Sequence, residues 1–235
     1  MKEKASKLLW YGLSSIAGLL LALAFALTGI EAVAFNRDRY ENAYARLHTA
    51  ADIGVSQDEL IGITDQVILY LRGEYPDLFR ISEINGVPQS TFREREILHM
   101  MDVKALFQRG YLLRGIAFGA SATIICFSVF FLKQKSLSFI LIGYEIGVGI
   151  LLSLCILVGV YFSLDFSKAF IQFHHVFFTN DMWLLSHNDM LIQMFPEQFF
   201  SEMTFAILVH MILWVIVPLL LVIVAQIILK YRKNK

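Results

Sequence analysis

Four long apolar runs dominate the pattern of hydrophobic and polar positions along the chain. They cover residues 8–30 (continuing past Glu31 to Phe35), 115–132 (or 111–132), 137–164 and 205–229. A helix needs roughly 20 apolar residues to cross the hydrocarbon core of a bilayer, and each run is close to that length or longer. The first run is too long for the apolar part of a cleaved secretory signal, which has about 7–15 residues. The pattern predicts an all-α membrane protein with four transmembrane helices.

The basic residues in the short flanks of these helices predict their orientation. With four crossings they all lie on one side, which the positive-inside rule makes cytoplasmic, whereas three crossings would split them. We therefore expect a multi-pass protein with both termini in the cytoplasm. The basic residues form three groups: Lys2, Lys4 and Lys7; Lys133 and Lys135; and Lys230, Arg232, Lys233 and Lys235.

The connections between the helices differ greatly in length. We expect the two long ones to form a small, mainly helical extracellular cap. The predicted segments are 1–35 (cytoplasmic flank and first helix), 36–110 (extracellular), 111–132 (second helix), 133–136 (cytoplasmic turn), 137–164 (third helix), 165–204 (extracellular, aromatic-rich) and 205–235 (fourth helix and basic tail).

Two capping boxes mark helices in the first extracellular segment. In a capping box, a Ser or Thr and a Glu three positions later satisfy the free amides of a helix start. Ser56–Glu59 opens a helix that Gly73 should end, and Thr91–Glu94 opens one that continues through His99 towards Phe107. Turn-forming residues separate the two helices: Pro76, Asn85–Gly86 and Pro88.

Composition narrows the class of protein. The chain is 57% hydrophobic and 17% charged, whereas about 25% of the residues of an ordinary globular protein are charged. Its 20 basic and 20 acidic residues cancel, so the chain has no large electrostatic footprint for nucleic acid. This excludes a soluble enzyme, a disordered chain and a disulfide-stapled module, and we expect no nucleic-acid partner.

Familiar catalytic motifs are absent from the sequence. Cys126 and Cys155 lie in membrane runs, where a thiolate is poorly solvated. There is no Gly-x-Ser-x-Gly elbow, glycine-rich phosphate loop or His-Glu-x-x-His helix. This argues against an acyl-enzyme and a standard zinc hydrolase, and we expect no metal and no cofactor. What remains is histidine: His48, His99, His174, His175 and His187 in the outer segments, and His210 slightly inside the fourth helix.

The neighbours of His99 and His174 single them out. Glu96 and Asp102 lie three residues before and after His99, so their carboxylates can share its helical face and orient the ring. An ordinary solvated helix face is the alternative. On a continuous helix over 162–178, His174 flanks an aromatic stripe and His175 points away from it. The stripe fits either an interfacial belt or the wall of an apolar pocket, and consists of Phe162, Phe166, Phe170, Phe173 and Phe177.

Charged or ionisable residues in membrane helices also raise the question of function. Glu145 and His210 belong to opposite leaflets, so we do not expect them to pair. Arg114 and Glu31 lie at outer helix ends, where they can pair with one another or bind lipid headgroups, and Arg114 can simply snorkel. The sequence assigns no role to four residues: Glu145, His175, His187 and His210.

Two blocks of the sequence resemble a known family. Residues 96–104, Glu-Ile-Leu-His-Met-Met-Asp-Val-Lys, are similar to its Glu-x-x-His-Met-x-Asp-Val block. Residues 173–178, Phe-His-His-Val-Phe-Phe, are similar to its Phe-His-x-x-Phe-Phe signature and precede Asn180, Trp183 and the Asp189-Met-Leu-Ile stretch. With the four helices and basic inner flanks, the whole chain resembles the lipoprotein intramolecular transacylases of Gram-positive bacteria.

This resemblance implies that the sn-2 acyl chain of an S-diacylglyceryl group moves to the α-amino group of the lipoprotein's N-terminal cysteine, giving the lyso-form. It implies His99 and His174 as catalytic residues. We expect diacylglyceryl lipoproteins and membrane lipid as partners, and a monomer in the bacterial plasma membrane with its site on the extracellular face. Supporting roles in orientation or in the substrate pocket fall to Glu96, Asp102, Arg114, Phe173, Phe177, Phe178, Asn180, Trp183 and Asp189.

The chemistry of this transfer suits two histidines. One neutral ring takes the proton of the attacking amine, and the other assists the oxyanion or the departing alkoxide, without an acyl-enzyme. Asp102 favours His99 as the base, although the sequence leaves the two assignments open. Two other functions remain as alternatives: a membrane hydrolase of lipids or lipoproteins that uses the same histidines, and a non-catalytic assembly or binding protein.

Overall fold

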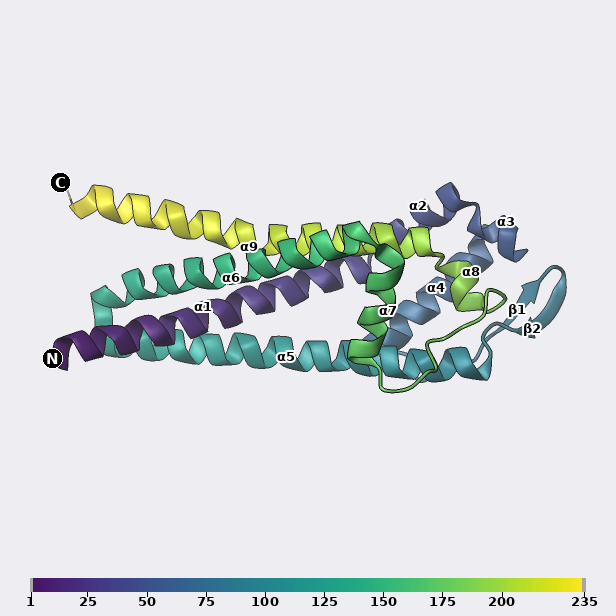
Figure 1. Cartoon of the computed structure of the whole chain (residues 1–235), viewed down its shortest axis with the longest axis horizontal. Coiled ribbons are helices and arrows are strands. Elements are labelled where there is room, and N and C mark those ends of the chain that lie inside the picture. Colours follow the sequence, from purple (N-terminus) through teal and green to yellow (C-terminus); the bar gives the residue numbers. More distant parts are fainter. Residues whose placement is uncertain (1, 234–235) are drawn as a thin grey trace. The chain divides into compact units, whose positions relative to one another are not determined.

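The computed structural model describes residues 2–233, which are mostly helical (Figure 1). Within this part of the chain, four helices are long and apolar enough to cross a membrane: α1, α5, α6 and α9. This confirms the predicted all-α membrane fold. The elements in chain order are α1 (Lys2–Ala34), α2 (Arg37–Leu47), α3 (Thr49–Ile53), α4 (Gln57–Arg72), β1 (Ile81–Ile84), β2 (Val87–Ser90), α5 (Glu94–Leu132), the 3₁₀ turn η1 (Lys133–Lys135), α6 (Ser136–Leu164), α7 (Phe166–Phe177), α8 (Met190–Met194) and α9 (Glu197–Lys233).

The chain divides into two compact units, and the long helices contribute to both. At about 1.5 Å per residue, the 39 residues of α5 extend roughly 58 Å, about twice the hydrocarbon thickness of a bilayer. The predicted apolar run of α5 covers only residues 115–132 (or 111–132), so residues 94–110 precede it. The first unit comprises Met1–Ala32, Tyr111–Val160 and Ile207–Lys235, and the second comprises Val33–Gly110 and Tyr161–Ala206.

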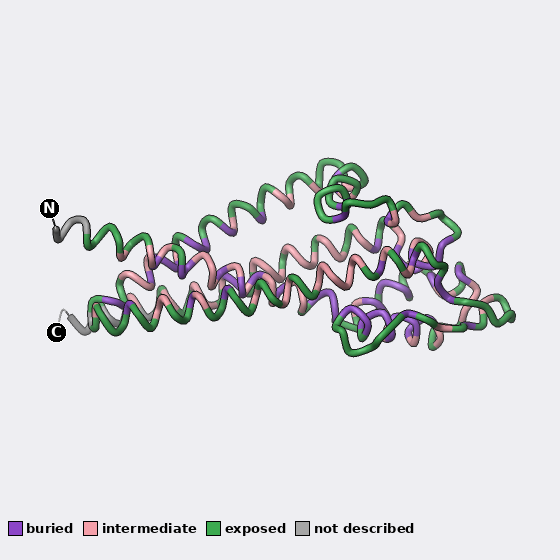
Figure 2. Tube along the Cα trace, turned by 90° about the horizontal axis from the view of Figure 1, so that it is seen from below, coloured by how far each residue is buried: buried purple, intermediate pink, exposed green. Residues whose placement is uncertain are grey.

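Small residues on α1 organise the first unit. A Cβ atom on Gly18 would lie 2.0 Å from the carbonyl oxygen of Gly143 in α6, and one on Gly29 would lie 2.9 Å from the His210 backbone in α9. The hydroxyl of Ser121 in α5 donates to the Ala17 carbonyl at 2.9 Å. Small side chains let membrane helices approach this closely. Buried positions therefore recur along α1 among exposed ones, as the tube in Figure 2 shows.

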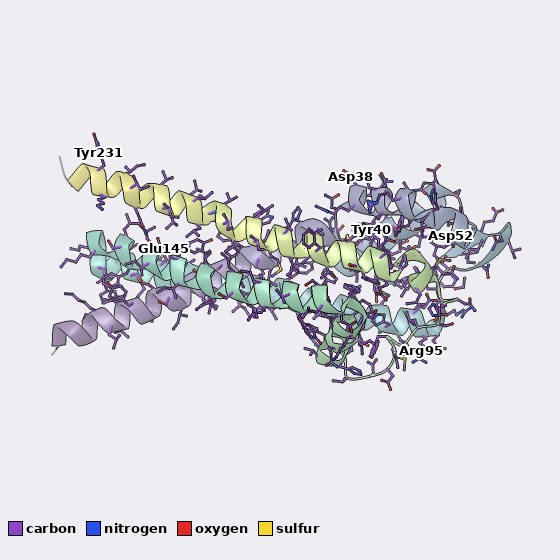
Figure 3. All side chains as sticks on the ribbon, turned by 45° about the horizontal axis from the view of Figure 1, so that its top comes forward. Asp38, Tyr40, Asp52, Arg95, Glu145 and Tyr231 are labelled. Carbon is purple, nitrogen blue, oxygen red and sulfur yellow. The ribbon has the colours of Figure 1, made fainter. Side chains whose placement is uncertain are left out.

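Two polar pairs lie within the first unit. Arg114 forms an ion pair with Glu31, which is one of the alternatives left open by the sequence. Glu145, labelled in Figure 3, accepts a hydrogen bond from the side-chain amide of Gln226 at 2.6 Å. The hydrogen-bond partner of Glu145 thus comes from α9.

Stacked aromatic rings and local caps shape the second unit. The Tyr44 ring stacks on Phe195 and Phe199 with centroids 6.4 and 6.1 Å away, and its hydroxyl lies 3.0 Å from that of Thr64. The serine half of the predicted capping box of α4 is confirmed, because the Ser56 hydroxyl accepts from the Glu59 amide at 3.1 Å. The Glu59 carboxylate accepts from the Arg80 guanidinium instead of from a helix-start amide. The helix ends at Arg72, before Gly73 in the left-handed conformation (φ 84°).

The second predicted capping box, Thr91–Glu94, does not form, and α5 is capped two residues further along the chain. Thr91 does not cap α5: its hydroxyl lies 2.7 Å from that of Ser82, across the β1–β2 hairpin. The helix begins instead at Glu94, where the Glu96 carboxylate accepts from the Arg93 amide at 2.8 Å. The turn signals between the two helices form this short antiparallel hairpin, whose Asn85 and Gly86 both have positive φ, as a type I′ turn requires.

Candidate active site

His174 reaches the candidate site from α7, a helix separated from α6 by one residue. The backbone of Asp165 is extended (φ −158°, ψ 95°), and its carboxylate caps α7 by accepting from the Lys168 amide at 3.0 Å. The helix over 162–178, which was the condition for placing His174 relative to the stripe, is therefore interrupted and is continuous only from Phe166 to Phe177. The aromatic stripe nevertheless crosses the break, since the ring centroids of Phe162 and Phe166 are 5.7 Å apart. Within α7 it continues through Phe170, whose ring lies 5.8 Å from Phe166 and 4.3 Å from His174.

His99 and His174 lie next to one another, although they are distant in the sequence. Their ring centroids are 5.8 Å apart, and the Phe178 ring lies 5.3 Å from His99 and 5.5 Å from His174. His174 is 6% exposed, whereas the adjacent His175 is exposed to solvent. The helical phase of α7 therefore turns His174 inwards and His175 outwards, as its position relative to the stripe predicts.

A backbone contact fixes the proton position on His174. Its Nδ1 lies 2.7 Å from the carbonyl oxygen of Phe170. A carbonyl oxygen only accepts hydrogen bonds, so Nδ1 carries the proton and, in the neutral ring, Nε2 is left as an acceptor. On one side of the ring lies the Trp183 indole, with its centroid 4.8 Å away and its plane tilted by 31°.

Burial keeps both histidines neutral. It lowers the pKa of His99 to about 4, an effect that the nearby His174 increases and Asp102 opposes. Burial also lowers the pKa of His174, and this effect outweighs that of the hydrogen bond to Phe170, which raises the pKa. The charged imidazolium is poorly solvated in such a site. Both rings are therefore neutral at neutral pH.

The two carboxylates that flank His99 bind the segment 178–191, here called the strap. Glu96 is 1% exposed and accepts from the backbone amide of Leu191 at 2.7 Å. Asp102 accepts from the side-chain amide of Asn180 at 2.9 Å. The expectation that these carboxylates orient the His99 ring by hydrogen bonds is therefore not met by the described contacts. Instead they hold the two ends of the strap beside His99.

Two further contacts fasten the strap to the start of α5. Asp189 is buried and accepts from the Arg93 guanidinium at 2.7 Å and from the Ser186 amide at 2.6 Å. Arg95, labelled in Figure 3, donates to the carbonyl of Asp181. The strap carries Trp183, so these contacts also position the indole against His174.

The rings around the pair differ in part from the expected ones. Phe173 and Phe177 contact each other at 4.7 Å and are 38% and 46% exposed, and the Phe173 ring also meets the His174 ring edge to face at 5.6 Å. The rings that enclose His174 most closely include Phe170, which was expected in the aromatic stripe but was not singled out as a supporting residue. Its position four residues before His174, and thus on the same helical face, was the available signal.

The remaining candidates have other partners. Arg114 belongs to the first unit, where it pairs with Glu31. His187 is exposed, and its backbone carbonyl accepts from Gln193 at 3.4 Å. Among residues 2–233, no three side chains of the types His, Cys, Asp and Glu converge on a point that could hold a metal ion.

Comparisons with known proteins agree with this architecture. Solved structures of the membrane-integral lipoprotein intramolecular transacylase Lit from Bacillus cereus are similar to the chain. One has a TM-score of 0.78 and 20% identity, with 97% of this chain and 99% of that chain covered. Another, with a histidine-to-arginine mutation, has a TM-score of 0.77 and 19% identity, with 100% and 98% covered. At this identity the likeness shows the fold.

Sequence comparison supplies the family. No curated protein sequence matches the chain. The family model described as "Lipoprotein intramolecular transacylase Lit" matches residues 15–200, which is most of the chain. The protein is thus a multi-pass membrane acyltransferase that belongs to the lipoprotein intramolecular transacylase family.

Proposed function

We propose that the protein transfers the sn-2 acyl chain of a lipoprotein's S-diacylglyceryl group to the α-amino group of the N-terminal cysteine, with His99 and His174 as catalytic residues. The product is a lyso-form lipoprotein, which is N-acylated and keeps one acyl chain on its glyceryl group. One observation carries this proposal: the buried imidazole of His174 and the half-buried imidazole of His99, from distant segments of the chain, lie 5.8 Å apart among aromatic rings.

The protonation state of the pair suits the attack of an amine on an ester. The α-amino group has a reference pKa of about 8 and loses a proton as it attacks. Because burial lowers the pKa of both histidines, each ring is neutral at neutral pH and can accept that proton.

His174 is the better candidate for the base. Its Nδ1–H is held by the Phe170 carbonyl, which leaves Nε2 free to accept the proton of the amine. Such orientation of an imidazole through its other nitrogen is a recurring feature of catalytic histidines. The spacing of Asp102 suggested His99 for this role, but the carboxylate of Asp102 binds Asn180.

The transfer needs no acyl-enzyme intermediate, because the amine attacks the ester directly. As the amine nitrogen bonds to the ester carbonyl carbon, Nε2 of His174 takes the amine proton. His99, a neutral ring, donates a hydrogen bond to the oxyanion or to the departing alkoxide. The bond between the carbonyl carbon and the sn-2 oxygen then breaks, and the proton passes from His174 to that oxygen.

The aromatic enclosure favours transfer over hydrolysis. Direct attack closes a ring of about eight atoms, which is entropically costly, so a site that folds the substrate back supplies much of the rate. The rings of Phe170, Phe178 and Trp183 exclude water, which would otherwise hydrolyse the ester. The exposed Phe173 and Phe177 offer apolar surface to acyl chains.

The orientation and partners are part of the same proposal. The basic helix flanks favour cytoplasmic termini in a bacterial plasma membrane, with the histidine pair on the extracellular face. Diacylglyceryl lipoproteins of the outer leaflet are then the substrates, in contact with membrane lipid, and a monomer suffices because both histidines come from one chain.

Expression in bacteria that lack other N-acylation enzymes tests the proposal. Tandem mass spectrometry of lipoprotein N-terminal peptides distinguishes the outcomes, because intramolecular transfer leaves the mass unchanged but moves one acyl group to a fragment that contains the cysteine nitrogen. Hydrolysis instead removes one acyl group from the peptide. We expect N-acylated peptides with the wild-type protein.

Histidine variants supply the control. His174→Gln and His99→Gln should each lower the rate by about 10²–10⁴-fold, the usual contribution of general acid–base catalysis. His175→Gln changes the exposed neighbour on the same helix and should retain most of the activity. Full activity of His174→Gln, or loss of one acyl group without N-acylation, would refute the proposal.

A further inference from the structure

The indole N–H of Trp183 is a buried donor at the site. Trp183 is 9% exposed, and its Nε1 atom has no hydrogen-bond partner within residues 2–233. Buried tryptophans usually find an acceptor for this group, and leaving it without one costs free energy. A phenylalanine would fill much of the same space without that cost, so packing alone does not explain an indole here.

The indole of Trp183 lies next to the residue that we propose as the base. Its ring lies 4.8 Å from His174, the candidate base, and is tilted by 31° against that ring. The edge-on ring of His175 lies 5.1 Å away on another side. Nδ1 of His99 is a second buried polar atom without a partner among the described residues. Two unpartnered polar groups therefore flank His174.

The strap fixes the indole in advance. Asn180 ties the strap to Asp102 three residues before Trp183, and Asp189 ties it to Arg93 six residues after. A donor that is already held in place loses no further freedom when charge develops next to it, which is the condition for electrostatic stabilisation of a transition state.

The chemistry of the indole defines its ligand. The N–H only donates and does not titrate near neutral pH, so its partner is an acceptor. The acceptor that this reaction brings beside His174 is the carbonyl oxygen of the migrating acyl ester, which becomes negatively charged when the amine attacks. We propose that Trp183 is a catalytic residue that donates a hydrogen bond to this oxygen. This inference rests on the proposed function.

The test replaces the N–H while keeping the aromatic ring. Trp183→Phe removes the donor, and replacement of the indole by its benzothiophene analogue keeps the shape but substitutes sulfur for N–H. Both proteins are purified as full chains and assayed with a synthetic diacylglyceryl-cysteinyl peptide in lipid vesicles. Trp214→Phe, on the exposed surface of α9, is the matched control.

The expected result separates catalysis from structure. Loss of one oxyanion donor should lower kcat by about 100-fold with little change in KM, for both replacements. The melting temperature of the benzothiophene protein should equal or exceed that of the wild type, because a buried unpaired donor has been removed. Trp214→Phe should keep the wild-type kcat.

Other results overturn the inference in distinguishable ways. If the benzothiophene protein keeps a wild-type kcat while His174→Gln is inactive, Trp183 is not a donor to the substrate and the proposed function stands. If the benzothiophene protein loses both activity and thermal stability, Trp183 is a structural residue. If the wild-type protein forms no N-acylated peptide, the proposed function fails and the inference fails with it.

Discussion

Glu96 should hold the strap over the histidine pair, and its replacement by alanine tests this directly. The carboxylate is 1% exposed and accepts from the Arg93 and Leu191 amides at 2.8 and 2.7 Å. Hydrogen bonds to charged groups contribute about 1.5–3 kcal/mol each. Burial raises the pKa of Glu96, so desolvation offsets part of this gain. Only the Leu191 amide belongs to the strap, so we take about 2 kcal/mol, within the range for one such bond, as the free energy of strap attachment lost in Glu96→Ala.

Hydrogen exchange measures this loss where it occurs. A change of about 2 kcal/mol in local opening corresponds to roughly 30-fold faster exchange. We expect this acceleration in peptides that cover residues 178–194, together with lower activity because Trp183 and His174 lose their alignment. Glu94→Ala removes an exposed carboxylate from the same helical turn and should change strap exchange by less than about threefold. If Glu96→Ala also stays within that limit, Glu96 does not hold the strap.

Three further predictions concern packing and pH. Gly143→Leu should prevent α1 and α6 from packing, because a Cβ atom at residue 143 would lie 2.1 Å from the Ser14 carbonyl oxygen. Gly149→Leu is the control and should be tolerated, since no atom lies within 4 Å of a Cβ at residue 149. The yield of folded protein checks both. His99 has a folded pKa of about 4 against 6.5 when unfolded, so the unfolded state binds more protons between these values and the wild type loses stability as pH falls through that window. His99→Gln should remove about 3 kcal/mol of this loss, and a melting temperature that drops as steeply with acid as in the wild type would contradict it. Finally, kcat/KM should rise with pH as the substrate amine, with a pKa of about 8, deprotonates. The acid limb set by His174 should have its midpoint below the ordinary histidine pKa, because burial lowers the pKa of His174. A midpoint above the ordinary histidine pKa would contradict a buried neutral base.

Local signals predicted much of the fold. The apolar runs gave the four membrane helices, because length and hydrophobicity alone decide which segments can span a bilayer. The cap at Ser56 was predictable since both of its hydrogen-bonding groups lie within four residues. The cap at Thr91 was not, because its hydroxyl binds Ser82 across a hairpin that the sequence showed only as turn residues.

The site was predictable only in part, for the same reason. Helical phase predicted that His174 turns inwards and His175 outwards, since that depends on neighbours in one helix. The partner of Asp102 was missed, because Asn180 belongs to a segment far along the chain. The approach of His99 and His174 is likewise a tertiary contact, and the sequence indicated it only through the resemblance of the two blocks to one family.

A crossover experiment tests the central claim most directly. Two diacylglyceryl-cysteinyl peptides of different sequence, one with an isotope-labelled sn-2 chain, are incubated together with the purified protein in water enriched in oxygen-18. We expect the label on the nitrogen of its own peptide only, no oxygen-18 in any fatty acid, and no product with His174→Gln. Labelled acyl groups on the other peptide would indicate an acyl-enzyme or an intermolecular route, and free fatty acid containing oxygen-18 would indicate a hydrolase; either result would contradict the account.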